Sequence, residues 1–181
     1  WCPFNETWDD PETGCRQDDE VLRAAYLATK AVDPTRPVID TSGNFHVVTD
    51  VYDIHDYEQE PEVFRAKFAP MAEGGEAYDN FPKRQRYGGQ PYFVSEYGGT
   101  WWNPAPEDGD NWGYGDRPGS EEEVLRRFAG LAAALLENPG ICGLCYTQLT
   151  DVEQEQNGLY AYDRGRKFSD RVYLGIRAAM T

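Results

Sequence analysis

Two glutamates each end a short apolar run of this sequence. Glu6 follows the run WCPFN, and Glu96 follows the run YFVS. Parallel α/β proteins bind their ligands at the carboxyl ends of the strands, so both carboxylates would lie where chemistry takes place. Two carboxylates that face each other can serve as the acid and the nucleophile or base of a glycosidase. A carboxylate at a strand end can instead cap the next helix or pair with a nearby base.

The elements that position these residues alternate between short apolar runs and longer stretches of helical period. Strands are predicted at 1–6, 37–41, 51–57, 91–96 and 140–148, and helices at about 18–32, 61–72, 120–138 and 168–180. Ser120 and Glu123 form a capping box at the start of the third helix. The alternation predicts βα units, a parallel sheet and therefore the α/β class. Two long loops, 73–90 and 97–119, are candidates for function.

Composition indicates a globular chain with neutral partners. The chain of 181 residues has 17 Lys and Arg against 32 Asp and Glu, a net charge of −15, which repels nucleic acid and anionic membranes. No apolar stretch approaches the roughly 20 residues that span a bilayer. Cellular location and oligomeric state stay open. Three of the four cysteines lie in or beside apolar runs and are expected to be reduced core residues, with metal or redox use as the alternative for Cys142 and Cys145. With only two histidines, no metal or other cofactor is expected.

Four motifs together resemble one known family. Asn5-Glu6, then 53–57 (DIHDY), 95–99 (SEYGG) and 146–153 (YTQLTDVE) closely resemble the catalytic barrel of glycoside hydrolase family 2, in the family's order. The resemblance covers essentially the whole chain. It implies a partial (β/α)8 TIM barrel made of the fourth to eighth βα units, forming one domain over 1–181. The first three units and the β-sandwich domains that precede the barrel in this family are expected to be absent, because the whole barrel takes about 250 residues.

The resemblance also implies roles for individual residues. Glu6 corresponds to the general acid/base, which needs a raised pKa, and Asn5 to the residue that binds the sugar 2-hydroxyl. Glu96 corresponds to the ionised nucleophile, and Tyr57 to the tyrosine that donates to it, although Tyr57 can instead pack as an ordinary aromatic residue. His55 lines the sugar pocket or is a core histidine. A retaining pair of this kind has carboxyl groups about 5–5.5 Å apart.

Further substrate contacts are expected from the segments after the later strands. Trp101 and Trp102 can stack on a sugar ring, or simply pack within their loop. Trp112 and Tyr114 lie further along the same loop. Asp151 can contact sugar hydroxyls from the rim, or be part of a solvated acidic edge.

The stretch Glu155-Gln156-Asn157 bears on the sugar. The β-glucuronidases of the family carry Asn-x-Lys here to bind the uronate carboxylate, and this chain does not. We therefore predict a retaining exo-acting β-glycosidase of carbohydrate metabolism that acts on neutral sugars, β-galactosidase-like. The alternatives are a β-glucuronidase, a β-mannosidase, or a non-catalytic carbohydrate-binding or structural barrel segment. The chain alone is expected to show little or no hydrolysis.

Overall fold

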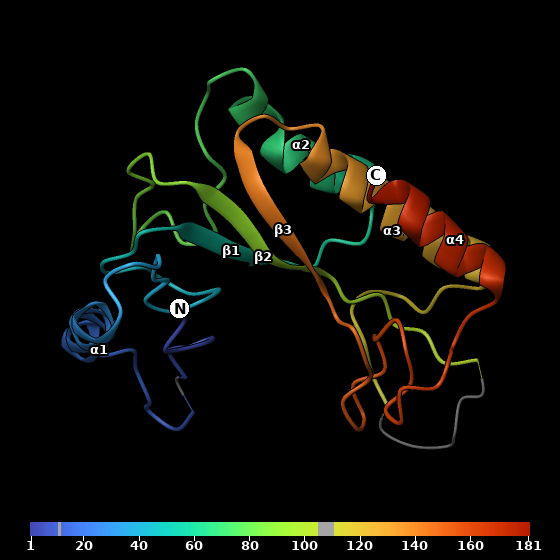
Figure 1. Ribbon diagram of the computed structural model, residues 1–181, viewed down its shortest axis with the longest axis horizontal. Helices are drawn as coiled ribbons and strands as arrows, with labels where there is room; N and C mark the ends of the chain where they lie inside the picture. Colours follow the sequence, from blue (N-terminus) through green and yellow to red (C-terminus); the bar gives the residue numbers. More distant parts are fainter. Residues whose placement is uncertain (11, 105–110) are drawn as a thin grey trace.

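The chain folds as a mixed α/β structure around one parallel sheet (Figure 1). The computed structural model describes residues 1–10, 12–104 and 111–181. In chain order the elements are α1 (Asp19–Val32), β1 (Tyr52–Asp56), α2 (Pro61–Ala72), β2 (Tyr92–Gly98), α3 (Glu121–Leu136), β3 (Ile141–Thr147) and α4 (Asp170–Ala179). The sheet order is β1-β2-β3, with both strand pairs parallel.

The helices begin close to where local signals predict. The Asp18 carboxylate accepts hydrogen bonds from the backbone N–H groups of Glu20 and Val21 at the start of α1. The Ser120 hydroxyl accepts from the Glu123 N–H at 3.3 Å, which caps α3. The Glu123 carboxylate reaches back one residue further than a capping box requires, to the Gly119 N–H. No helix in the part of the chain that the structure describes is long and apolar enough to cross a membrane.

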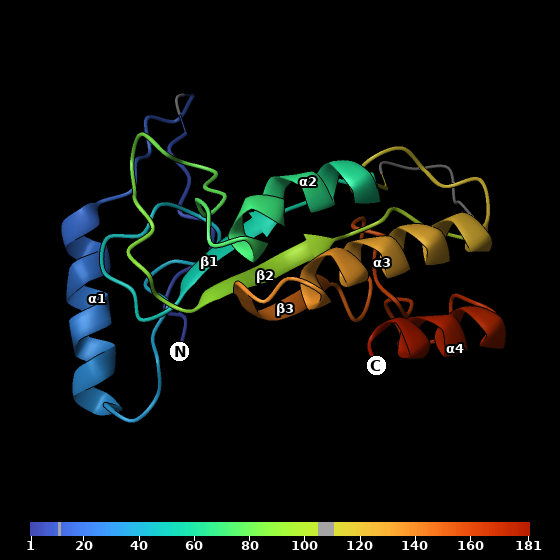
Figure 2. The ribbon, with the colours of Figure 1, turned by 90° about the horizontal axis from the view of Figure 1, so that it is seen from above.

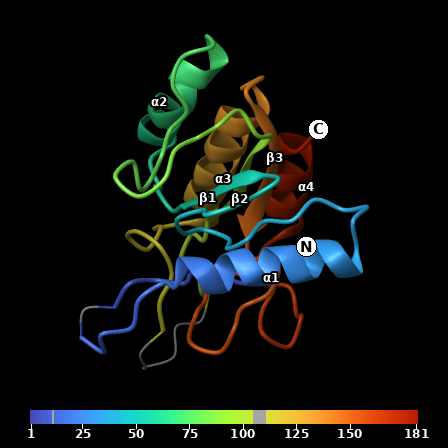
Figure 3. The ribbon, with the colours of Figure 1, turned by 90° about the vertical axis from the view of Figure 1, so that its left-hand side faces the viewer.

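The main core lies on one face of the sheet. Helices α2 and α3 cover this face, and α4 packs against α3 (Figure 2). Helix α1 lies at the opposite end of the molecule from α4, and Figure 3 shows it in front of the other helices. The buried residues between sheet and helices are Tyr52, Ile54, Phe64, Phe68, Met71, Tyr92, Val94, Tyr97, Leu131, Ala134 and Leu135. Since strand side chains alternate between faces, polar residues of the strands are left on the side away from these helices.

Only three of the five predicted strands form. Segments 1–6 and 37–42 lie side by side and parallel, but they share a single bridge between Asn5 and Ser42. Two carboxylates compete for the backbone of the second segment: Asp50 accepts from Val38, while Asp40 accepts from Thr41 and from two later residues. Three backbone hydrogen bonds still join the two segments, from Ile39 to Trp1, from Ser42 to Phe4 and from Glu6 to Ser42, but their spacing is irregular and neither segment becomes a regular strand.

The prediction that the cysteines pack in the core is wrong. All four are exposed and reduced. Cys142 and Cys145 lie on β3, the last strand of the described sheet, which is at most half-buried along its length. The apolar composition of the strand led us to expect burial, but a strand at the edge of the sheet leaves these side chains exposed.

Candidate active site

A pocket of about 550 Å³ opens at the carboxyl ends of the strands and gathers four of the eight predicted site residues. Asn5, Glu6, Tyr57 and Glu96 all line it. They come from segments that are far apart in the sequence and become neighbours only through the parallel arrangement. The position agrees with the rule that places ligands at this end of a parallel sheet.

An irregularity in β2 turns its polar residues toward the pocket. Ile54 of β1 pairs with Val94, but the next residue, His55, pairs with Glu96, so Ser95 is an extra residue on β2. A bulge of this kind redirects side chains and is common beside active sites. It allows Ser95 and Glu96, although adjacent, both to line the pocket.

The backbone at Glu6 makes a second sharp turn. Its φ of 48° lies in the left-handed region, which costs a non-glycine residue about 1–3 kcal/mol. Side chains of neighbouring residues diverge in an extended strand, so Asn5 and Glu6 could not otherwise reach one pocket. The turn at Glu6, at the end of the first extended segment, brings both side chains to the pocket.

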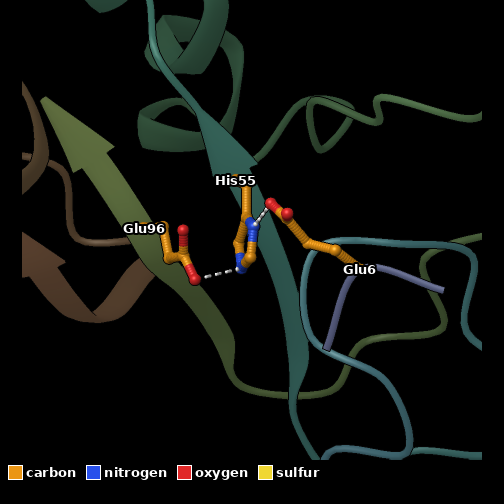
Figure 4. Close-up of side chains that lie close together, drawn as sticks. All are labelled: Glu6, His55 and Glu96. Atoms are coloured by element: carbon orange, nitrogen blue, oxygen red, sulfur yellow. Dashed lines mark hydrogen bonds and ion pairs between the residues drawn. The ribbon is translucent and has the colours of Figure 1, made fainter. Parts of the chain in front are cut away.

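His55 lies between the two carboxylates (Figure 4). Its Nδ1 is 2.7 Å from Oε1 of Glu6, and its Nε2 is 3.4 Å from Oε1 of Glu96. The imidazole is buried, with 3% of its side chain exposed. One possible metal-ligand atom from each of the three residues lies within 4.8 Å of the others, close enough to hold a cation. Because these atoms already pair with each other, we assign no metal here.

Glu96 is held by an aromatic pair. The Tyr57 hydroxyl donates a short hydrogen bond to Oε2 of Glu96. The Tyr114 ring stacks on the Tyr57 ring, with centroids 3.5 Å apart and planes 3° from parallel. Gly99 permits this stack, because a Cβ there would lie 2.4 Å from the Tyr114 ring, and its φ of 59° also favours glycine. The Glu96 carboxylate is thus oriented by a neutral donor with a fixed ring.

The pKa directions of the two carboxyls are opposite to those expected for their roles. The hydrogen bond to His55 lowers the pKa of Glu6, outweighing the effect of partial burial. Burial raises the pKa of Glu96, and the bond from Tyr57 only partly opposes it. The expectation of a raised pKa at Glu6 is therefore wrong for this arrangement, because a basic partner faces that carboxylate.

A buried chain of polar residues continues from the second nitrogen of His55. Ser42 Oγ lies 2.9 Å from His55 Nε2 and 2.6 Å from Asp53 Oδ2. Asp53 in turn lies 3.3 Å from His46, which pairs with Asp40 at 2.7 Å. Asp40 and Asp53 are fully buried side chains with a histidine between them. The motif 53–57 supplied Asp53 and His55 on β1, but the sequence offered no signal for Asp40, Ser42 and His46, which come from irregular backbone.

The structure does not place Trp101 or Trp102 in this pocket. Trp102 stacks on Phe168 beside α4, with centroids 6.2 Å apart. Trp101 lies against the Arg117 guanidinium, 5.9 Å from its ring centroid. Neither is among the residues that line the pocket. In an irregular loop no periodicity indicates which way a side chain points, so packing within the loop prevails at both positions.

Asp151 is also engaged elsewhere. Its carboxylate accepts from the Lys167 ammonium at 2.7 Å and from the Gly158 N–H at 2.8 Å. Both side chains are buried, with 9% of Asp151 and 3% of Lys167 exposed. Asp151 therefore ties the segment after β3 to the segment before α4 and is not part of the pocket lining.

Trp112, Tyr114 and Glu155 form the pocket wall instead. Trp112 exchanges backbone hydrogen bonds with residues 154 and 156, and the Tyr114 N–H donates to the Gly99 carbonyl. The aromatic richness of the loop was visible in the sequence. Which of its aromatic residues reach the pocket depends on these pairings.

Comparisons with known proteins bear on the fold. No protein-family model matches the sequence, and no curated protein is similar to it. Solved structures do resemble it. A family 2 β-galacturonidase from Eisenbergiella tayi bound to galacturonate matches with a TM-score of 0.66 at 17% identity, over 98% of this chain and 33% of that one.

Two β-glucuronidases give a similar result. The Ruminococcus gnavus enzyme, in complex with an N1-substituted uronic isofagomine, has a TM-score of 0.61 at 15% identity, over 99% of this chain and 31% of its own. The Bifidobacterium dentium enzyme, complexed with coumarin-3-O-glucuronide, has a TM-score of 0.57 at 20% identity, over 94% and 28%. This chain therefore spans about a third of such enzymes or less, and over that part it has the fold of family 2 glycoside hydrolases.

Proposed function

We propose that the chain carries the catalytic pair of a retaining, exo-acting β-glycosidase. The observation that carries the proposal is the convergence of Glu6 and Glu96, from distant segments, on one pocket with carboxylate oxygens within 4.8 Å. Retaining glycosidases have carboxyl groups about 5–5.5 Å apart, whereas inverting enzymes leave room for a water molecule between them at about 6.5–9.5 Å. The short separation supports the retaining course.

The reaction then proceeds by two displacements. Glu96, oriented by the Tyr57 hydroxyl, attacks the anomeric carbon and forms a glycosyl ester, while Glu6 protonates the departing glycosidic oxygen. Glu6 next accepts a proton from water, which attacks the anomeric carbon and releases the sugar with its configuration retained. Asn5 lines the pocket beside Glu6, where it can bind a sugar hydroxyl.

The pocket wall favours a neutral sugar. Trp112 is 44% exposed and offers an aromatic face at the pocket. Glu155 adds a third carboxylate to the described lining, which contains no Lys or Arg. A uronate would require a cationic partner and would meet repulsion there. A β-galactoside-type substrate is therefore our first choice, with β-mannosides as the neutral alternative.

A uronide is the second candidate, because the similar solved structures are named as galacturonidases and glucuronidases. The two classes separate by relative rates on nitrophenyl β-galactoside and nitrophenyl β-galacturonide. We expect the neutral substrate to be preferred, and Glu155→Gln to improve the uronide rate by removing a like charge. A strong preference for the uronide with Glu155 intact would reject the neutral assignment.

We further propose that residues 1–181 form a catalytic-barrel segment equivalent to the fourth to eighth βα units. Four extended segments, three of them regular strands, contribute residues at their carboxyl ends to one pocket, and a fifth, 37–42, lies parallel to the first; this arrangement supports the assignment. Activity then requires the preceding units, so the chain alone should hydrolyse glycosides slowly or not at all. Hydrolysis by the chain alone at the rate of a complete enzyme would reject the proposal.

The experiment that tests catalysis uses the longer protein that carries this chain. A 2-deoxy-2-fluoro-glycoside with a good leaving group should trap a covalent adduct on Glu96, identified by peptide mass, and Glu96→Gln should abolish both labelling and turnover. Azide should partly restore activity to Glu6→Ala. A non-catalytic carbohydrate-binding or structural segment predicts no adduct and no effect of either substitution on turnover.

A further inference from the structure

Ser42 has one hydroxyl proton and three close polar neighbours. Its Oγ lies 2.6 Å from Asp53 Oδ2, 2.9 Å from His55 Nε2 and 3.2 Å from Ser95 Oγ. A carboxylate can only accept, and a hydrogen bond to a charged acceptor is about twice as strong as a neutral one. Ser42 therefore donates its hydroxyl hydrogen bond to Asp53.

Asp53 is ionised in this network. Burial acts to raise its pKa, but hydrogen bonds from His46, Ser42 and Ser95 outweigh burial and hold the pKa below the ordinary value. With its only proton given to Asp53, Ser42 can serve His55 solely as an acceptor. His55 must then carry a proton on Nε2, and the nearby Glu96 carboxylate, 3.4 Å away, favours the same state.

The distance from Glu6 then restricts the protonation of the other nitrogen of His55, Nδ1. Nδ1 lies 2.7 Å from Oε1 of Glu6, a distance at which two bare acceptors would repel each other. A single proton lies between them, on the imidazole or on the carboxyl. The hydrogen bond with His55 lowers the pKa of Glu6, so the carboxylate is the acceptor in this contact and Nδ1 is the donor.

We propose that Ser42, anchored by Asp53, is a positioning residue that fixes the Nε2–H form of His55, so that Nδ1 stores the proton which Glu6 delivers. This inference rests on the proposed function. As the glycosidic bond breaks, the Nδ1 proton moves to Glu6 and Glu6 delivers it to the leaving oxygen, leaving ionised Glu6 and neutral His55. When water attacks, Glu6 accepts one proton from it and passes that proton to Nδ1, which restores the resting state.

The arrangement accounts for an acid whose own carboxyl is ionised at rest. The titratable and charged groups that surround the imidazole are Glu6, Glu96, Asp53, the Tyr57 ring at 6.5 Å and, beyond Asp53, His46. Acidic groups lie on both sides of the ring.

Nitrogen-15 NMR of the chain itself tests the tautomer without any need for activity. The sequence has two histidines, so a histidine-labelled sample gives two imidazole spin systems, assigned with His55→Gln. In Glu6→Gln the introduced amide can either donate to Nδ1 or accept from it, so it favours neither neutral tautomer of His55. The contact between Ser42 and Nε2 then determines which nitrogen carries the proton. We expect a proton on Nε2 and none on Nδ1. The reverse tautomer would overturn the proposal.

A matched pair of serine variants gives the second arm. Adding Ser42→Ala to Glu6→Gln should remove the preference of His55 for the Nε2–H tautomer and populate the Nδ1–H tautomer. Adding Ser95→Ala should not, because Ser95 bonds the same Asp53 carboxylate without touching His55. An equal effect of both serines, or none from Ser42→Ala, contradicts the proposal.

Kinetics of the longer protein give the third arm. Ser42→Ala should slow glycosides with poor leaving groups by about 10²-fold or more, since they depend on general acid catalysis. The loss on dinitrophenyl glycosides should be much smaller, and Ser42→Thr, which keeps the hydroxyl, should recover most of the rate. An equal loss on both substrate classes would refute the role. Absence of turnover in the unmodified protein, with the predicted NMR tautomer present, would reject the proposed function and not the tautomer.

Discussion

Replacement of His46 should remove a large pH-dependent part of the stability. Burial acts to lower the pKa of His46, but its bonds to Asp40 and Asp53 prevail and raise the pKa to about 10, from 6.5. A histidine with a raised folded pKa stabilises the native state fully below its unfolded pKa and loses this contribution as pH rises toward the folded value. The shift corresponds to roughly 5 kcal/mol at about 1.4 kcal/mol per pKa unit. Between pH 6.5 and 8.5 the free energy of unfolding should therefore fall by about 2 kcal/mol.

The assay is urea unfolding of the chain at several pH values from 6 to 9, followed by circular dichroism. In His46→Gln most of the slope should disappear, and the variant should be less stable by about 3–5 kcal/mol at neutral pH because two buried carboxylates lose their partner. His55→Gln is the matched control, since it leaves His46 with both carboxylates and should keep most of the slope. A flat profile in the unmodified chain refutes the reasoning even if His46→Gln does not fold, and so does an unchanged slope in His46→Gln.

Two further substitutions test the site and its support. Tyr57→Phe removes the bond that opposes the burial-raised pKa of Glu96, so the pKa should rise further and the acid limb of the kcat/KM profile should move to higher pH; an unmoved limb would contradict the assigned contact. Lys167→Met should cost about 3–5 kcal/mol in urea unfolding, because it leaves buried Asp151 unpaired. Arg166→Met, which breaks an exposed pair, should leave the free energy of unfolding nearly unchanged, and equal costs would contradict the burial argument.

The helices were predictable because their signals are local. Asp18 and Ser120 cap α1 and α3 as their positions in the sequence indicate. The two missing strands depend on contacts that the sequence does not show. The Asp40 and Asp50 carboxylates capture backbone N–H groups only once the chain has turned back on itself. An apolar run fixes extended backbone there, but not its pairing.

The candidate site, like the fold, was predictable where the signals are local and not where it depends on distant contacts. The sequence placed Glu6, Tyr57 and Glu96 at strand ends, and the structure brings all three to one pocket. It did not indicate the β2 bulge at Ser95, which comes from register, or the pairing of His55 with Glu6, which comes from a turn with positive φ. Side-chain partners across loops therefore set the electrostatics that strand periodicity leaves open.

The partners, more than burial, distinguish the two carboxyls. Glu6 and Glu96 expose nearly the same fraction of their side chains, 30% and 27%, so desolvation alone would treat them alike. Glu96 accepts from the neutral Tyr57 hydroxyl and lies 3.4 Å from His55 Nε2, whereas Glu6 lies 2.7 Å from His55 Nδ1. In the resting arrangement this makes Glu6 the more readily ionised group. If the imidazole did not supply a proton, the roles would have to be exchanged, and the fluoro-sugar adduct would form on Glu6 instead of Glu96.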